Sequence, residues 1–249
     1  MESNLRDAIE FLVNLGDENA DPKVIEIDGK TYCTRNLRRY DEKPEAEAIK
    51  GASLTALLDY IIENQQEMPD RKMIVHVTSP TTVRFYSSLD NERKRETLFI
   101  AEAKLPEFIF GRNMSQENFV ISLQSCFFKN DDVEMLLKVA GNVENKSVSS
   151  YGDDGVTQKA TIKQGIASKA DVIVPNPVLL IPYRTFLEVE QVASKFVFRI
   201  SEGVGGVPEF KLIEADGGAW KYEAMQRVAE YLKKHLEKFI KDGKIIVIA

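Results

Sequence analysis

The stretch "EADGGAWKYEAMQRVAEYLKKHLEKFI", residues 214–240, contains a long helical pattern and the point where a strand passes into it. Its apolar residues recur every three or four positions, which predicts one continuous buried helix face. That face comprises Trp220, Ala224, Val228, Leu232, Leu236 and Phe239 or Ile240. Asp216 is predicted to cap the helix, with Gly217 and Gly218 forming a tight turn before it. Glu223 and Arg227 have the spacing of an ion pair along a helix.

The same turn has a second interpretation, in which the backbone amides of Gly217 and Gly218 bind an anion at the helix N-terminus. The charge of Asp216 would repel an anion, so we favour the structural role for Asp216 and Trp220. If Trp220 is fully buried, Trp220→Ala is expected to lower the free energy of unfolding by about 3–5 kcal/mol.

Upstream of this stretch, helical and strand patterns come in separate blocks. Ser53 is predicted to cap a helix over 53–66, Ser115 to cap one over 116–128, and Asp131 to open a third over 131–140 with Glu134. Strand patterns occupy 72–80, 81–89, 96–105, 157–163, 170–190, 193–201, 207–215 and 244–249. This order predicts an α+β fold with a mainly antiparallel sheet, segregated helices, and a long C-terminal helix followed by a short terminal strand. The first three strands are expected to form an antiparallel meander.

The first 50 residues have a different character. A short helix is predicted over 4–15, and Asp28-Gly29 predicts a hairpin because both residues tolerate positive φ. A charged, proline-containing stretch, "NLRRYDEKPEAEAIKGA", follows at 36–52. We therefore expect an N-terminal arm over 1–50 and a main α+β domain over 51–249.

Composition limits the classes of function. The net charge of −6 argues against a surface that wraps nucleic acid without sequence preference. No apolar run is long enough to cross a membrane, and the N-terminal sequence is not a secretion signal. Cys33 and Cys126 are far apart and form no CxxC pair, which favours a reducing cytoplasm.

One enzymatic hypothesis comes from "FIAEAKL", residues 99–105. Glu102 and Lys104 would share one face of a strand, and with Asp90 they imitate the core of Mg²⁺-dependent nucleases. The alternative is an exposed cross-strand ion pair, which we favour. Mg²⁺ is expected only under the nuclease hypothesis, since His76 and His235 lack partners at ligand spacing.

A binding hypothesis centres on Tyr183 and Arg184, at the end of a strand pattern. A guanidinium can hold phosphate with two hydrogen bonds, so Arg184 is the best single candidate for binding DNA or a nucleotide signal. Gly217, Gly218 and the polar residues of "YGDDGVTQK" at 151–159 are further candidates. The alternative, that Arg184 pairs with a nearby acid, is favoured.

Five strings together resemble the YfdQ-like family of uncharacterised phage and prophage proteins. They are "MSQENFV", "DDGVTQKATIKQG", "VPNPVLLIPYRTFLEVE", "FRI" and "EADGGAWKYEA", and the likeness runs from about Ser53 to Ile240. The resemblance implies a phage-encoded protein whose genes tend to lie near recombination and replication functions. It implies no reaction. Nucleic-acid metabolism and anti-defence roles are both compatible with it.

The leading prediction is a non-enzymatic assembly or binding protein that forms a homo-oligomer, with phage or host proteins or nucleic acid as possible partners. Pro175, Pro177 and Pro182 cannot donate to a strand ladder, so their segment should lie at a sheet edge or contain a bulge. The terminal apolar strand "KIIVIA" at 244–249 should pair within the sheet or across a subunit interface.

Overall fold

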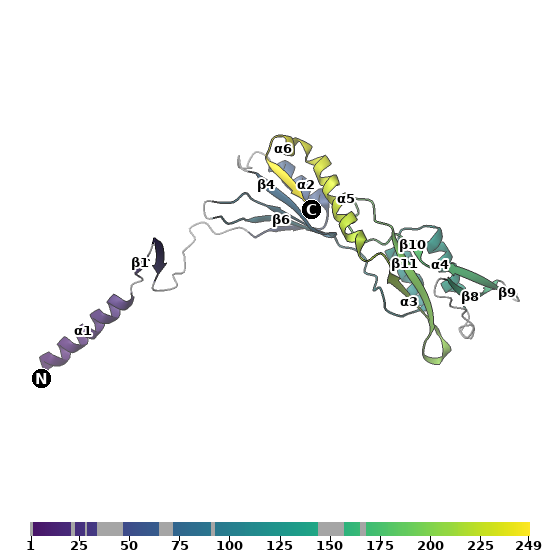
Figure 1. The fold of residues 1–249 in the computed structure, drawn as a ribbon, viewed down its shortest axis with the longest axis horizontal. Coiled ribbons are helices and arrows are strands. Elements are labelled where there is room, and N and C mark those ends of the chain that lie inside the picture. The colour runs from purple at the N-terminus through teal and green to yellow at the C-terminus, as the bar shows by residue number, and fades with distance from the viewer. Residues whose placement is uncertain are drawn as a thin grey trace. The chain divides into compact units, whose positions relative to one another are not determined.

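A computed structural model describes residues 2–20, 23–27, 29–33, 47–64, 72–90, 93–143, 157–164 and 168–249 (Figure 1). The chain divides into two units, Met1–Glu45 and Ala46–Ala249, which are considered separately. The candidate residues of "YGDDGVTQK" up to Val156 lie outside the described ranges. No helix within those ranges combines the length and apolarity that crossing a membrane requires.

The described residues of the first unit form one helix and one hairpin. These are α1 (Glu2–Ala20), β1 (Val24–Ile27) and β2 (Lys30–Cys33). The strands pair antiparallel with Ile27 opposite Lys30, and Gly29 has a φ of 74°. The predicted hairpin is therefore confirmed, and the helix is longer at both ends than the predicted 4–15.

One sheet of the second unit has five strands in the order β13-β4-β5-β6-β3, so it joins the start of the unit to its C-terminal strand. Its strands are β3 (Ile49–Gly51), β4 (Met73–Ser79), β5 (Thr82–Tyr86), β6 (Thr97–Glu102) and β13 (Ile245–Ile248). β4, β5 and β6 form the predicted antiparallel meander, while β3 and β13 add parallel edges. The predicted domain boundary at residue 50 falls inside β3, which belongs to this sheet.

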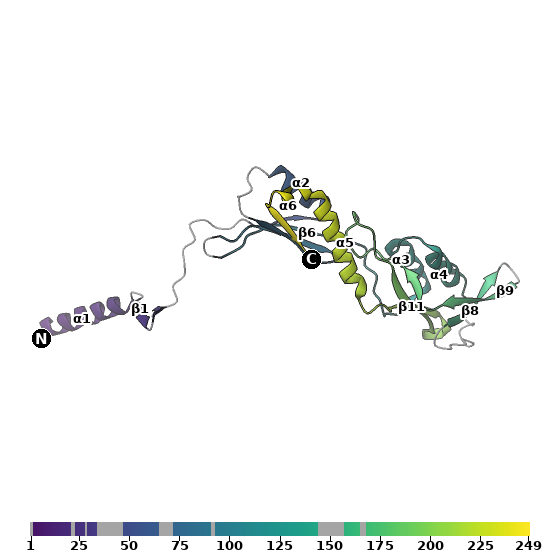
Figure 2. The ribbon, with the colours of Figure 1, turned by 45° about the horizontal axis from the view of Figure 1, so that its top comes forward.

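Three helices pack against this sheet: α2 (Leu54–Glu63), α5 (Ala219–His235) and α6 (Glu237–Lys241) (Figure 2). Ser53 caps α2 as predicted, accepting a hydrogen bond from the Ala56 amide at 3.1 Å. The predicted long helix is interrupted at Leu236, which separates α5 from α6. Apolar faces of the helices and the sheet enclose the first core, which also includes Phe186 and Val189 from a distant loop.

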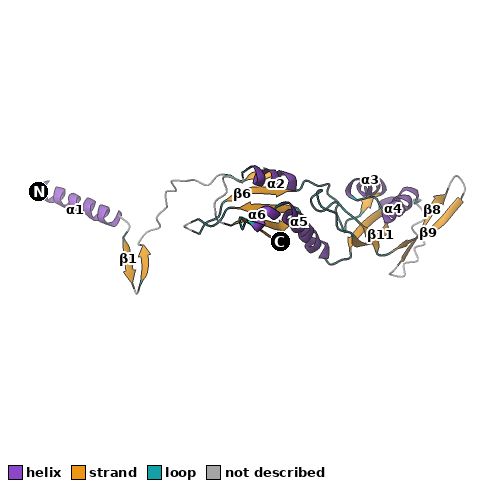
Figure 3. Ribbon diagram, turned by 90° about the horizontal axis from the view of Figure 1, so that it is seen from above, coloured by secondary structure: helices purple, strands orange, loops and turns teal. Residues whose placement is uncertain are grey.

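A second sheet, in the order β10-β11-β12-β7, carries helices α3 and α4 (Figure 3). The strands are β7 (Met114–Ser115), β10 (Val178–Leu180), β11 (Ser194–Glu202) and β12 (Pro208–Glu214). The helices are α3 (Gln116–Cys126) and α4 (Asp131–Asn142). A short 3-10 helix, η2, spans Val204–Gly206 between β11 and β12. Two further strands, β8 (Thr157–Gln164) and β9 (Ser168–Pro175), pair with each other in a separate two-stranded ribbon. Phenylalanine rings dominate this second core.

The predicted N-terminal cap is confirmed for α3 and wrong for α4. Ser115 caps α3, accepting from the Asn118 amide at 3.4 Å, as expected. The cap of α4 is Asn130, whose side chain accepts from Val133 at 2.9 Å, so the predicted box opened by Asp131 is wrong. The reason is geometric, because Asp131 already lies within the helix and Asn130 has the extended backbone that a cap requires.

The proline-marked segment lies at sheet edges, as predicted. β10 is an edge strand, β9 belongs to a two-stranded ribbon, and Pro182 forms an isolated bridge with Phe127. The terminal strand β13 pairs with β4 of its own chain, so one of its two predicted partners is now identified. These sheets and the separate helices confirm the α+β class with mainly antiparallel pairing.

Candidate functional site

Arg184 is the centre of the candidate site. The backbone just before it is fixed to the second sheet region by the Tyr183 amide, which donates to the Cys126 carbonyl at 2.9 Å. The Arg184 side chain is only 10% exposed, and its Nη1 donates to Glu214 Oε1 at 2.6 Å. Its Nη2 donates to the Ser194 hydroxyl at 2.6 Å. The favoured interpretation, an ion pair with a nearby acid, is thus the observed one.

The guanidinium is also surrounded by aromatic rings. Its central carbon lies 3.9 Å from the centre of the Trp220 ring, 5.5 Å from that of Phe196 and 6.0 Å from that of Phe110. A cation over an aromatic face is attracted by the ring quadrupole, most strongly for tryptophan. Of these three rings, Trp220 makes the closest contact with the guanidinium.

Burial and neighbouring acids act on the charge in opposite directions. Burial lowers the pKa of Arg184 to about 10, while the carboxylates of Glu214 and Asp216 oppose that shift. Arg184 remains a cation at neutral pH. Burial acts to raise the pKa of Asp216, but hydrogen bonds from Gly218 and Ser194 and the charge of Arg184 together hold it below its usual value. The site consequently contains one guanidinium beside two carboxyl groups, those of Glu214 and Asp216.

A cavity of about 650 Å³ lies beside this cluster. Aromatic side chains line it from several elements, among them Phe108, Phe110, Tyr183 and Trp220. Arg184, Glu102 and Glu107 are its charged lining residues. Its volume lies within the range of about 300–1,000 Å³ that small-molecule sites occupy. The tertiary structure has therefore gathered candidates from two separate hypotheses, Glu102 and the Tyr183–Arg184 pair, at one cavity.

Two hydrogen-bond donors at this cavity have no acceptor among the described residues. They are Trp220 Nε1 and Arg184 Nε, both shielded from solvent. A buried donor without an acceptor costs about 1–3 kcal/mol, and such groups in native proteins call for a specific explanation. Both belong to residues that line the cavity, although neither nitrogen is itself exposed to it.

The glycine turn contributes structure at this point. Gly217 and Gly218 have φ of 64° and 81°, which glycine adopts without strain. The Gly218 amide donates to Asp216 Oδ1 at 3.0 Å, so it is not open to an anion. Gly218 itself is the cap residue of α5, and the predicted capping role of Asp216 is wrong. Asp216 closes the turn two residues earlier because both glycines adopt the left-handed conformation.

The three nuclease candidates do not come together. Asp90 lies in the β5–β6 connection, where its carboxylate accepts from the Lys94 amide at 2.8 Å. Glu102 is the last residue of β6, about 16 Å from its first residue, Thr97, at about 3.3 Å per residue, and Asp90 precedes that first residue. Lys104 follows the end of the strand and is exposed. Across the described ranges no cluster of three or more His, Cys, Asp or Glu side chains could hold a metal.

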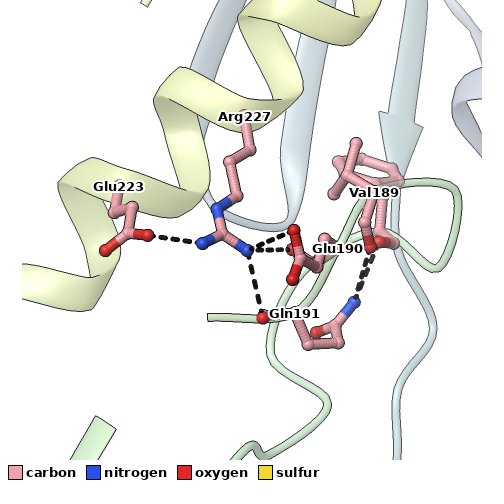
Figure 4. Close-up of polar contacts among 6 residues, drawn as sticks. Val189, Glu190, Gln191, Glu223 and Arg227 are labelled. Carbon is pink, nitrogen blue, oxygen red and sulfur yellow. Dashed lines mark hydrogen bonds and ion pairs between the residues drawn. The ribbon is translucent and has the colours of Figure 1, made fainter. Parts of the chain in front are cut away.

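Sequence reasoning missed two residues that hold the Arg184 loop. Gln191 Oε1 accepts from the amides of Arg184 and Thr185 at 2.9 and 3.2 Å. Arg227 on α5 donates from Nη1 to the carbonyls of Glu190 and Gln191, both at 3.1 Å (Figure 4). The predicted pair of Arg227 with Glu223 is confirmed, at 2.5 Å. That pair was visible as helical spacing, whereas no local pattern links Arg227 with the loop.

Comparisons with family models, with curated proteins and with solved structures found no match for this chain. The resemblance to the YfdQ-like family accordingly stays a prediction. The geometry around Arg184 is the remaining basis for a functional argument.

Proposed function

We propose that this chain is a non-enzymatic binding protein that takes a small, planar, uncharged molecule in the Arg184 cavity. The observation that carries the proposal is the stack of the nine-tenths-buried Arg184 guanidinium on Trp220 at the wall of that cavity. Burying an arginine is costly unless its charge is paired, and here Glu214 supplies the pair while Nε lacks an acceptor among the described residues.

The charge of the cavity determines which ligands it favours. Arg184 is already paired with Glu214, while Glu102 and Glu107 add negative charge to the lining. A phosphate would be repelled by these carboxylates and would find both terminal nitrogens of the guanidinium engaged. This argues against the phosphate-binding form of our sequence-based hypothesis.

The uncharged part of the cavity favours a flat ligand with acceptor atoms. Aromatic rings provide stacking surfaces, and Trp220 Nε1 and Arg184 Nε provide N–H donors that lack partners among the described residues. Both nitrogens are shielded, so an acceptor reaches them only when the indole shifts on the guanidinium. Nucleobases and related heterocycles have the required planarity and carbonyl or ring-nitrogen acceptors.

Binding is preferred to the nuclease hypothesis because Asp90 and Glu102 lie at opposite ends of β6. We extend the proposal to a phage-encoded protein in the host cytoplasm, acting beside recombination, replication or anti-defence functions. This extension is supported by the family resemblance and by the cysteine usage of the sequence.

The proposal is tested through Trp220, which is the only tryptophan of the chain and so the sole source of indole fluorescence. Emission is recorded during titration with uracil, adenine, adenosine and adenosine monophosphate. We expect a saturable change with the uncharged compounds and at least about tenfold weaker binding of the monophosphate, a difference of about 1.4 kcal/mol.

Arg184→Lys serves as the matched variant, because it keeps the charge but loses the flat, stacked guanidinium. It should bind at least about tenfold more weakly. Trp220→Phe has no indole emission, so its binding of the same uncharged compounds is measured by calorimetry, which checks that the fluorescence change of the wild type reports binding. No saturable response to any of the uncharged compounds would contradict the proposal, as would tighter binding of the monophosphate.

A further inference from the structure

The first unit, Met1–Glu45, has no core among its described residues: every side chain described there is exposed. Its exposed large apolar residues are Leu5, Ile9, Phe11, Leu12, Val13, Leu15, Val24, Ile25, Ile27 and Tyr32. A unit of this size rarely buries enough surface to be stable alone, and oligomerisation is one of the usual remedies. The apolar side chains of this unit therefore call for a partner surface.

The residues of α1 follow a seven-residue repeat. With Leu5 at position a, Ala8 falls at d, Leu12 at a and Leu15 at d, and Ile9 and Phe11 flank this seam at e and g. Leu5, Phe11 and Leu12 are 66%, 63% and 63% exposed. The apolar stripe is wider than a simple a/d seam, so it offers contact surface to more than one neighbouring helix.

The charged residues in the middle of α1, where side chains are described, lie away from that stripe. Arg6 and Asp7 occupy positions b and c, and Glu10 occupies position f. Arg6 Nε donates to Glu10 Oε1 at 3.1 Å, one turn along the outer face. Like charges on identical helices would therefore not face each other across the central part of the stripe.

We propose that α1 packs its Leu5–Leu12 stripe against the α1 helices of further copies of this chain, forming a homo-oligomeric helix bundle. A second copy supplies the same neutral, apolar stripe, so the two surfaces are complementary in polarity. A membrane surface fits less well, because helices that lie on membranes carry Lys and Arg on their polar faces. The described outer face of α1 instead carries two acids, Asp7 and Glu10, and one cation, Arg6.

The length of α1 is consistent with such a bundle. Its 19 residues extend about 28 Å at 1.5 Å per residue. An isolated helix of this length is marginal in water unless its apolar face is packed. Association would thus stabilise the helix as well as join the subunits.

The experiment measures the mass of the full chain by multi-angle light scattering at micromolar concentration. Wild-type protein is expected at a multiple of 28.2 kDa, and Leu12→Glu at 28.2 kDa itself. Asn14→Glu is the matched control, since it adds the same charge at position c of the same helix and should leave the oligomer intact. Circular dichroism of both variants checks that the second unit remains folded.

Three outcomes overturn the proposal. A monomeric wild type removes the oligomer, and an unchanged oligomer in Leu12→Glu places the interface outside this stripe. Dissociation of Leu12→Glu and Asn14→Glu alike would mean that added charge, not the apolar stripe, controls assembly. None of these results bears on ligand binding in the Arg184 cavity, so the two proposals fail or stand separately.

Discussion

Trp220 is half-buried, with its indole stacked on the Arg184 guanidinium at 3.9 Å. The helical pattern predicted that it would begin the buried face of α5, and the fully buried residues of that face are Ala224, Val228 and Leu232. Trp220 instead borders the Arg184 cavity. At the residue scale, one side chain thus takes part in both the packing of the joint and the candidate site.

Trp220→Ala is therefore expected to lower the free energy of unfolding by about 1–3 kcal/mol, less than the about 3–5 kcal/mol of a fully buried tryptophan. Urea denaturation followed by circular dichroism measures this difference. Tyr222→Ala, at a residue 71% exposed on the same helix, is the control and should change stability by less than about 0.5 kcal/mol. Equal losses in the two variants would show that the contact with Arg184 contributes nothing.

At the scale of elements, the loop between β10 and β11 links the two cores of the second unit. Phe186 and Val189 enter the first core, and the Thr185 hydroxyl donates to the Pro80 carbonyl at 2.6 Å. The same loop contains Arg184, whose guanidinium donates hydrogen bonds to Ser194 at the start of β11 and to Glu214 at the end of β12. The position of the candidate site is thus determined by how this loop is held.

The Gln191 side chain forms several hydrogen bonds to the backbone of that loop. Besides accepting from Arg184 and Thr185, its Nε2 donates to the Phe186 carbonyl at 3.1 Å. Gln191→Ala is expected to cost about 1–3 kcal/mol, because backbone groups lose their partners. It should also change the emission of Trp220, since Arg184 would be less well fixed against the indole.

Urea denaturation and fluorescence spectra measure these two effects. Glu190→Gln is the control, because the Glu190 side chain is 86% exposed and its 3.5 Å pair with Arg227 should be worth less than about 1 kcal/mol. Unaltered stability and emission in Gln191→Ala would show that other contacts suffice to hold the loop.

At the scale of the whole molecule, the two units differ in how they are stabilised. Ala46–Ala249 contains two cores with fully buried side chains, and the terminal β13 contributes Ile245 to the first of them. The edge strand that suggested assembly in the sequence is thus paired inside its own chain. Exposed apolar surface is concentrated on α1 and the hairpin instead.

Removal of residues 1–45 should therefore leave the urea midpoint of the remaining chain unchanged while abolishing self-association. The physical reason is that the described residues of the removed segment bury no side chain. Denaturation curves and light scattering on the truncated protein measure both effects. A lower midpoint would show that the first unit stabilises the second, and a retained oligomer would locate assembly in the second unit.

Local sequence determined the elements. Helical periodicity, the caps at Ser53 and Ser115, the turn at Gly29 and the meander of β4–β6 were all predictable, because each depends on residues near one another in the chain. Caps were mistaken where two adjacent polar residues competed, as Asn130 and Asp131 do.

Only the tertiary structure decided the site and the two parallel edges of the first sheet. Arg184 and Glu214 are 30 residues apart, and Gln191 and Arg227 are 36 apart, so no local period brings either pair together. The parallel pairing of β3 with β6 and of β13 with β4 likewise joins distant segments. Short-range propensities fix whether a residue lies in a helix or a strand, whereas its neighbours across the fold follow from how the apolar faces of those elements are buried together.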